Sequence, residues 1–208
     1  MHPNPAFRGE TPARNLAFAR QRGFGVLAVS DDRGPLISHV PFLLNETGTQ
    51  AHLHLVRSNP IARLLDNPCP AVIAVSGPDG YISPDWYGLP DQVPTWNYVA
   101  VHLRGTLRRL PDEALRPILD AVSDHFEDGL APKPPWRTAK MDPNAMDRMM
   151  RAIVPIRLDI DTVDGTWKLG QNKPEDARLG AAEGVGNGTA GQDTQALARL
   201  MREPPLAK

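Results

Sequence analysis

Cysteine is almost absent from this sequence. The single thiol, Cys69, excludes a disulfide within the chain, and its apolar flanks favour a small buried side chain over a reactive one. The chain has 23 Lys and Arg against 24 Asp and Glu, so it lacks the basic excess that marks a dedicated DNA-binding domain. No apolar run approaches a membrane span, and the start MHPNPAFRGE has no signal-peptide pattern. These absences favour a soluble, cytoplasmic protein.

The common signatures of catalysis and nucleotide binding are also missing. We find no glycine-rich dinucleotide fingerprint, no P-loop and no nucleophile elbow, and no Ser/His/Asp set stands out. The sequence therefore names no catalytic residue. Proline, by contrast, is abundant at 22 residues, which favours many strand ends and loops over a helical bundle.

The hydrophobic pattern that is present predicts a mainly β fold of the α+β class. Residues 98–104 alternate strictly, with Val99, Val101 and Leu103 on one side, as in a half-buried strand. Similar strands are expected at 24–30, 35–44, 51–57, 70–77 and 155–163, with Asp164-Gly165 as a hairpin turn into a returning strand. Helices are expected at about 12–22, 60–65, 112–126 and 142–153. Short connections between strands predict an antiparallel sheet, closed into a small barrel with helices packed on it.

A first candidate site is the strand end Arg57-Ser58-Asn59, followed one turn later by Arg63. A forked cation, a hydroxyl and the free N–H groups of a helix start suit a phosphate monoester. An ordinary helix cap beside a surface arginine explains the same residues, so both interpretations stay open.

Histidines form a second candidate. His52 and His54 are two residues apart on one strand and share a face, where they could chelate a metal. No further ligand stands at a supporting spacing, so solvated or hydrogen-bonded histidines are expected and no metal is predicted.

Aromatic and amide side chains gather in two stretches. One runs from Tyr81 through Trp86-Tyr87 to Trp96-Asn97-Tyr98, and the other is Trp167-Lys168 with Gln171-Asn172. Flat rings, amides and a lysine suit a planar, hydrogen-bonding heterocycle, but they also suit a core whose polar tips bond to the backbone. The residues alone do not separate the two interpretations.

Taken together, these segments resemble the PaiB-type family of FMN-binding proteins, often labelled negative transcriptional regulators. The matching stretches, in the family's order, are SHVPFLL, HLVRSNP, GPDGYISPDWY, VPTWNYVAVHLRG, PWR, MMRAIVPI and WKLGQN. VPTWNYVAVH is long and specific, and the resemblance covers roughly residues 5 to 185. It implies an FMN-binding split-barrel domain over residues 1–183, an antiparallel Greek-key barrel. The remaining residues, 184–208, lie outside the resemblance, and their composition predicts a flexible Gly-rich linker and a terminal helix.

The resemblance also implies a homodimer with FMN at the subunit interface. The phosphate would be held by Arg57, Ser58, Asn59 and Arg63, and the strand around Ser38-His39 would lie along the isoalloxazine. The cofactor ring or its ribityl chain would be approached, in part from the partner subunit, by Thr95, Trp96, Asn97, Lys168, Gln171 and Asn172.

The sequence and the family resemblance are compatible with three functions. The first is a flavin-dependent oxidoreductase of small molecules or a flavin-based sensor, where the protein tunes the flavin through hydrogen bonds. The second is a negative transcriptional regulator, for which the sequence shows no helix-turn-helix and no basic stripe, so direct nucleic-acid binding is doubtful. The third is a haem-binding split barrel, which the histidines permit.

Overall fold

Eight strands and six α-helices make up the described part of the chain. The computed structural model describes residues 2–204. The strands are β1 (Phe24–Asp31), β2 (Gly34–Pro41), β3 (Leu43–Leu44), β4 (Gln50–Val56), β5 (Cys69–Ile82), β6 (Thr95–Arg109), β7 (Ile153–Lys168) and β8 (Gly191–Gln192). The helices are α1 (Pro12–Arg22), α2 (Pro60–Leu64), α3 (Leu115–Asp128), α4 (Pro143–Met150), α5 (Glu175–Asn187) and α6 (Thr194–Arg202), with short 3₁₀ turns at Pro5–Phe7, Pro84–Tyr87, Asp112–Ala114 and Thr138–Lys140.

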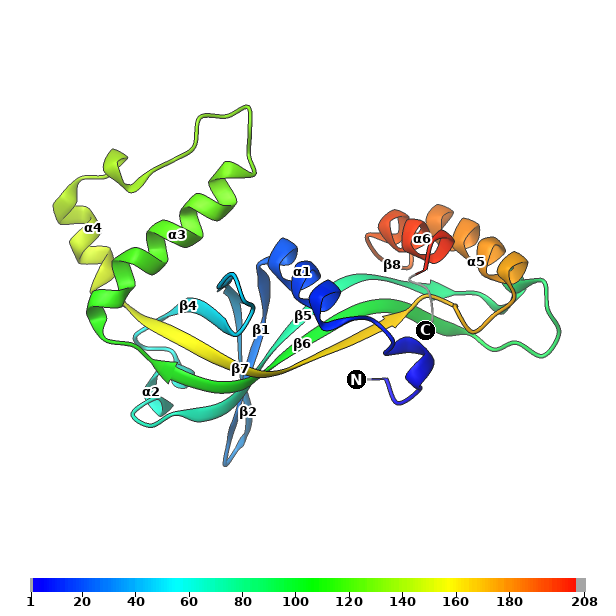
Figure 1. Ribbon diagram of the computed structural model, residues 1–208, viewed down its shortest axis with the longest axis horizontal. Helices are drawn as coiled ribbons and strands as arrows, with labels where there is room; N and C mark the ends of the chain where they lie inside the picture. The colour runs from blue at the N-terminus through cyan, green and yellow to red at the C-terminus, as the bar shows by residue number, and fades with distance from the viewer. Residues whose placement is uncertain (1, 205–208) are drawn as a thin grey trace. The chain divides into compact units, whose positions relative to one another are not determined.

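The strands form one antiparallel sheet, which confirms the predicted fold class. Their order is β2-β1-β5-β6-β7-β4-β3, with β8 paired to β5 (Figure 1). The register places Val26 opposite both His39 of β2 and Ala74 of β5, and Leu53 of β4 opposite Ile156 of β7. β4 therefore meets β7 across about 100 residues of sequence, as a barrel-like sheet requires.

The alternation expected along β6 is confirmed. Val99, Val101 and Leu103 are at most 1 % exposed, whereas Tyr98 and Arg104 lie on the opposite, more accessible face. Asn97 shares the buried face and is only 1 % exposed. The strand therefore carries a buried amide next to the apolar row Val99, Val101 and Leu103.

The chain separates into two compact units. Unit 1 contains residues 1–17, 76–101 and 164–208, and unit 2 contains residues 18–75 and 102–163. The divisions fall inside α1, β5, β6 and β7, so each of these elements contributes one segment to each unit. Unit 2 holds β1 to β4 with α2, α3 and α4, and unit 1 holds α5, α6 and β8.

The expected hairpin at Asp164-Gly165 is wrong, because β7 continues unbroken to Lys168. Gly165 is there for close packing: a Cβ on it would lie 2.1 Å from Oδ1 of Asn15. That same oxygen accepts a hydrogen bond of 2.8 Å from Nε1 of Trp167. The turn comes after the strand, at Gly170, whose φ of 78° is in the left-handed region that glycine favours.

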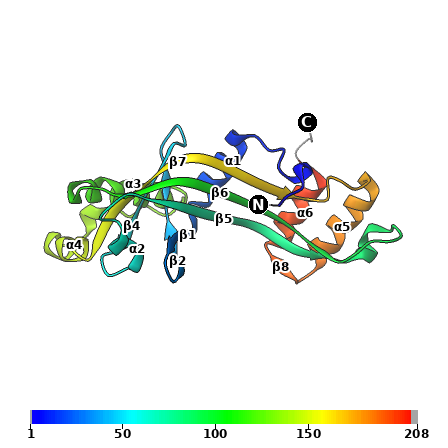
Figure 2. The ribbon, with the colours of Figure 1, turned by 90° about the horizontal axis from the view of Figure 1, so that it is seen from below.

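The glycine-rich segment expected as a flexible linker begins in a helix. α5 runs to Asn187, and its Ala181, Ala182 and Val185 are at most 1 % exposed. It lies beside α6 in both views of the ribbon (Figures 1 and 2), and α6 confirms the expected terminal helix. A Cβ on Gly184 would lie 2.3 Å from the Trp86 ring, so the glycine lets an indole lie against the helix.

Within residues 2–204, no helix has both the length and the apolar character that a membrane crossing requires.

Candidate functional site

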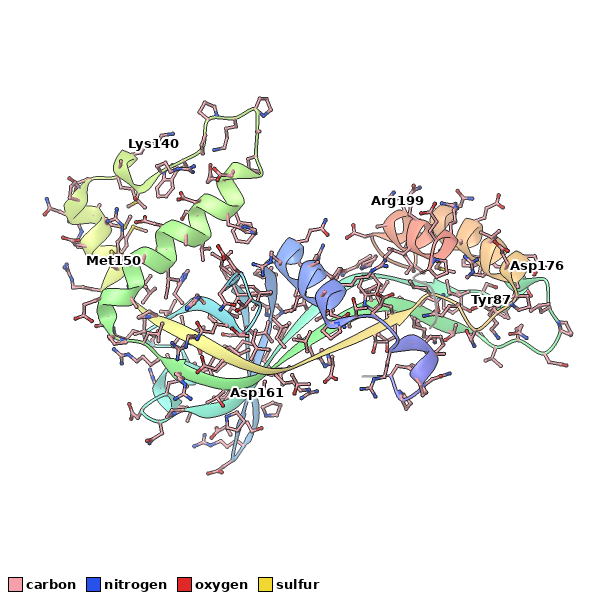
Figure 3. All side chains as sticks on the ribbon, viewed as in Figure 1. Tyr87, Lys140, Met150, Asp161, Asp176 and Arg199 are labelled. Atoms are coloured by element: carbon pink, nitrogen blue, oxygen red, sulfur yellow. The ribbon has the colours of Figure 1, made fainter. Side chains whose placement is uncertain are left out.

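A cavity of about 370 Å³ in unit 1 brings together four residues that the sequence predicted to bind a cofactor. Thr95 and Asn97 reach it from β6, Lys168 from the end of β7, and Asn172 from the turn that follows. The wall also includes His2, Asn4, Phe7, Tyr87, Asp91, Gln92, Val93, Gly170 and Lys173, and Figure 3 labels Tyr87. The site therefore combines amide, hydroxyl and ammonium groups with aromatic rings.

Two lysines give the cavity its positive character. Nζ of Lys168 donates to Oγ1 of Thr95 at 2.5 Å, and Nζ of Lys173 donates to Oε1 of Gln92 at 2.5 Å. Each ammonium also lies near an aromatic face, Lys168 at 5.9 Å from the Phe7 ring centroid and Lys173 at 5.3 Å from that of Tyr87. Burial lowers the pKa of Lys168, and the Lys173 charge lowers it further. A negative charge on a ligand beside Lys168 would offset these effects and favour the charged form of the lysine.

Lys173 was not among the predicted residues. The sequence feature that could have indicated it is the pair of lysines in WKLGQNK, because the turn at Gly170 brings Lys173 back beside Lys168. The position of the Lys173 side chain depends on the conformation of the turn, which the sequence pattern alone does not specify. The sequence therefore did not predict that Lys173 lies in the cavity.

The two carboxamides after β7 have different roles. Gln171 uses its side chain within the turn: Oε1 accepts from the Leu169 amide at 2.8 Å, and Nε2 donates to the Trp167 carbonyl at 2.6 Å. Nε2 also lies 3.2 Å from the Ala6 carbonyl, and Gln171 does not line the cavity described above. Asn172, which is exposed, does line it. Gln171 therefore shapes the turn that presents its neighbour.

Trp96 is separated from Thr95 and Asn97 by the strand itself. Neighbouring residues of a strand point to opposite faces, and Trp96 lines a second cavity of unit 1. The sequence placed all three on one cofactor, but only Thr95 and Asn97 share a cavity. Asn97 also donates from Nδ2 to Sδ of Met201 at 3.5 Å, which ties β6 to α6.

The strand-end candidates lie in unit 2. Asn59 caps α2 by accepting from the Ile61 amide at 2.9 Å, and its Nδ2 donates to Oγ of Ser38 at 2.7 Å. This bond brings together the predicted phosphate and ring segments of that unit. Ser58 and Arg63 are exposed. His39 is exposed as well, and its ring stacks on Phe24 with centroids 6.4 Å apart.

The Arg57 side chain makes hydrogen bonds within the protein. Its Nε donates to the Arg151 carbonyl at 3.1 Å and its Nη2 to the Ile153 carbonyl at 3.2 Å, where α4 ends and β7 begins. Nη2 also lies 3.6 Å from Oδ2 of Asp112. The capping interpretation thus gains direct support for Asn59, and Arg57 has a structural role whatever else it contacts.

The histidine pair of β4 gathers no further ligands. Among residues 2–204 no group of three or more His, Cys, Asp or Glu side chains is placed to hold a metal ion. His52 lies opposite Arg157 and His54 opposite Pro155 in the β4–β7 ladder.

The chain matches a known protein family over most of its length. Residues 1–162 match the family model described as "Putative FMN-binding domain". The chain belongs to this FMN-binding family. Membership confirms the resemblance seen in the sequence and the predicted flavin cofactor.

Two relatives are similar to this chain in sequence. The chain is 25 % identical over 188 residues to "Protease synthase and sporulation protein PAI 2" of Bacillus subtilis, covering 89 % of both chains. It is 32 % identical over 123 residues to the yeast protein YKL070W from Saccharomyces cerevisiae, covering 53 % of this chain and 73 % of that protein.

Two solved structures share the fold. One is the FAD and haem binding protein from Mycobacterium smegmatis, with a TM-score of 0.57 and 21 % identity over 89 % of this chain and 82 % of that chain. The other is the flavocytochrome Anf3 from Azotobacter vinelandii, with a TM-score of 0.55 and 13 % identity over 89 % and 78 % of the two chains. These likenesses confirm the predicted split-barrel fold.

Proposed function

We propose that this chain is an FMN-dependent oxidoreductase acting on a small molecule. One observation carries the proposal: Thr95, Asn97, Lys168 and Asn172, which the family resemblance assigned to a flavin, line one cavity. Lys173 adds a second cation to the same wall. The groups present match the chemistry of a flavin, whose ring system has carbonyl and imino edges and whose side chain ends in a phosphate.

The protein residues would bind the cofactor and set its charge preference. The two carboxamides, Asn97 and Asn172, can each donate and accept, as the polar edge of a heterocycle requires. The Lys168 ammonium, held by Thr95, would favour negative charge on the group beside it. When bound, FMN supplies the electron transfer.

The exposed Ser58 and Arg63 are the side chains of unit 2 that we propose for the phosphate. Arg57 would support them by holding the strand end against the carbonyls of Arg151 and Ile153. The two residue sets lie in different units, and we propose that a homodimer supplies both sets to each flavin.

The apolar outer face of β1 and β2 supports the homodimer. Phe24 is 51 % exposed and Ile37 is 59 % exposed. The register puts Phe24 opposite Pro41 and Ala28 opposite Ile37, with Val26 opposite His39 between them, so Phe24 and Ile37 share one face with the His39 ring. Large apolar side chains gathered on one sheet face are typical of a subunit contact.

The proposal is tested by the visible spectrum and by titration of the apoprotein with FMN. Bound FMN should give flavin absorption bands, and Lys168→Met should weaken FMN binding about tenfold, the loss expected for one charge-assisted hydrogen bond. Lys140→Met, which removes an exposed lysine of unit 2, is the matched control. Failure of the wild-type protein to bind FMN would overturn the proposal, and so would equal affinities of the two variants.

The phosphate residues have their own test. Arg63→Ala should weaken FMN binding more than riboflavin binding, because riboflavin lacks the phosphate. Arg148→Ala, an exposed arginine on α4, is the control and should leave both affinities unchanged. An unchanged FMN affinity in Arg63→Ala would remove this residue from the phosphate site.

The same preparation tests the two other functions. Added haem would give a Soret band if the barrel binds haem, and promoter DNA would shift in a salt-dependent way if the chain represses transcription directly. The formal net charge of −1 gives little attraction to DNA, so we expect no shift in the presence or absence of FMN.

A further inference from the structure

The second cavity of unit 1 has a different chemistry from the first. Its volume is about 560 Å³, and it is lined by Trp96 and its neighbours on β6 together with residues of β5 and β8. The lysine cavity uses Thr95 and Asn97 of the same strand. The alternation of β6 therefore gives each cavity its own side chains.

An aromatic side chain dominates this cavity. Trp96 is 49 % exposed, and Tyr81 supports it in a T-shaped contact with ring centroids 6.3 Å apart. Tyr98, two residues along, lies on the same face of the strand and lines the cavity too. An exposed tryptophan braced by a second aromatic ring is a typical platform for stacking a flat ligand.

Small residues clear the space around the platform. Ser76, Gly77, Ala100 and Gly191 contribute little or no side chain. Gly191 must be a glycine, because its φ is 145° and an added Cβ would lie 2.3 Å from the Asp79 carbonyl oxygen. A flat molecule can thus approach the backbone of β5 and β8 closely.

The charge of the cavity is negative. Of the lining residues within the described chain, Asp79 is the one with a formal charge, and it is half-buried. Its Oδ1 accepts from the Gln192 amide at 3.0 Å, which fixes the carboxylate beside β8. A carboxylate near an indole favours a cation over an anion, and tryptophan is the side chain that attracts cations most strongly through its ring face.

We propose that this cavity binds a planar aromatic cation, stacked on Trp96 and charge-matched by Asp79. Such a ligand would be a separate occupant from a flavin, whose polar pyrimidine edge suits the lysine cavity instead. The site does not depend on the flavin proposal, and the two can fail independently.

Calorimetric titration with 1-methylquinolinium, 2-naphthoate and tetramethylammonium tests the proposal. These probes are a planar cation, a planar anion of similar size and a cation without a ring. We expect 1-methylquinolinium to bind at least about tenfold more tightly than either of the others. Weak and equal binding of all three probes would overturn the proposal.

Variants then locate the binding. Trp96→Leu should weaken 1-methylquinolinium binding by about fivefold or more, as expected for loss of a cation–π contact, and Trp96→Phe should restore part of it. Asp79→Asn keeps the oxygen that accepts from Gln192 but removes the charge, so it should reduce the preference for 1-methylquinolinium over 2-naphthoate. Phe126→Ala, which removes a 38 % exposed aromatic of unit 2, is the control and should have no effect.

Two further results separate this site from its neighbours. FMN should not compete with 1-methylquinolinium, and Lys168→Met should leave 1-methylquinolinium binding intact. Competition by FMN would assign the cavity to the flavin and overturn the proposal. Conversion of an oligomer to monomers by Trp96→Leu would do the same, because the indole would then belong to a subunit contact.

Discussion

Gly165 shows how the absence of a side chain lets another residue pack closely against a strand. Read as sequence, Asp164-Gly165 is a turn pair, because glycine is the residue that most often permits a hairpin. In the fold it lies inside β7 and leaves space for Asn15, whose Oδ1 binds Nε1 of Trp167. Asn15 is 3 % exposed, so this hydrogen bond is a buried one. A glycine needed for space looks the same in a sequence as a glycine needed for a turn.

Gly165→Ala should therefore destabilise the protein. The added methyl group would displace Asn15 from the Trp167 indole, and overpacking of this kind costs about 1–3 kcal/mol of unfolding free energy. Urea denaturation measures the loss. Gly9→Ala is the matched control, because a Cβ there would meet no atom within 4 Å. Equal stabilities of the two variants would show that Asn15 can move aside without loss.

His54 provides a residue-scale prediction about pH. Burial lowers its pKa from the usual 6.5, and its Nδ1 has no hydrogen-bond partner. The unfolded chain thus takes up a proton near pH 6.5 that the folded state resists, so the free energy of unfolding falls as the pH drops below about 6.5. This contribution to stability is fully present above that pH.

His54→Gln should reduce this acid sensitivity. The difference in unfolding free energy between wild type and variant should be constant above about pH 7.5 and should shift in favour of the variant on acidification. Denaturant unfolding at a series of pH values measures it. Parallel curves from pH 7.5 to 5 would contradict the assignment. Burial and the Arg157 charge lower the pKa of His52 as well, so part of the slope should persist in the variant.

At the scale of elements, α5 depends on glycines that resemble a linker. Gly180 and Gly184 lie one turn apart on the helix, and a Cβ on either would come within 2.6 Å of the Trp86 carbonyl oxygen or ring. Glycine in a helix interior normally destabilises it by about 1 kcal/mol relative to alanine. Here the close approach of Trp86 offsets that loss.

Gly184→Ala should accordingly lower the melting temperature, although alanine favours helices. Glu183→Ala, at the exposed neighbouring position, should leave the melting temperature nearly unchanged. A shift of the tryptophan emission spectrum in Gly184→Ala alone would report displacement of Trp86. A higher melting temperature in Gly184→Ala would show that the indole contact contributes less than helix propensity does.

Much of the fold could be predicted because hydrophobic alternation is a local signal. Val99, Val101 and Leu103 face the core as their period of two requires, and Asn59-Pro60 begins α2 as capping chemistry predicts. The misassigned segments both involve glycines whose neighbours are distant in sequence. The sequence around Gly165 does not indicate that Asn15 packs against it, and the sequence around Gly184 does not indicate that Trp86 does.

The candidate site was predictable to a similar extent. Thr95, Asn97, Lys168 and Asn172 meet in one cavity, as expected from the family resemblance. Trp96 does not join them, although strand alternation alone could have separated it from its neighbours. The long-range bonds of Arg57 to carbonyls 94 and 96 residues away had no local signal.

At the scale of the whole molecule, the proposed homodimer makes a prediction about assembly. Ile37→Asp would put a charge on the apolar outer face of β1 and β2, so we expect it to shift the protein from dimer to monomer and to weaken FMN binding with it. Sedimentation velocity measures the assembly. Met149→Asp, at a 61 % exposed apolar position on α4, is the control and should remain dimeric. A monomeric wild-type protein would contradict the homodimer.

The alternation of β6 has a consequence for how this protein can evolve. Consecutive residues of one short segment line different cavities: Thr95 and Asn97 line the cavity that contains two lysines, and Trp96 lines the cavity that contains Asp79. Point substitutions can change either cavity alone, because each side chain belongs to one face. A register slip of one residue cannot, since it would turn the indole toward the lysines and the hydroxyl and amide toward Asp79. Insertions and deletions in the loop before β6 should therefore be tolerated only where they leave the register of this segment unchanged.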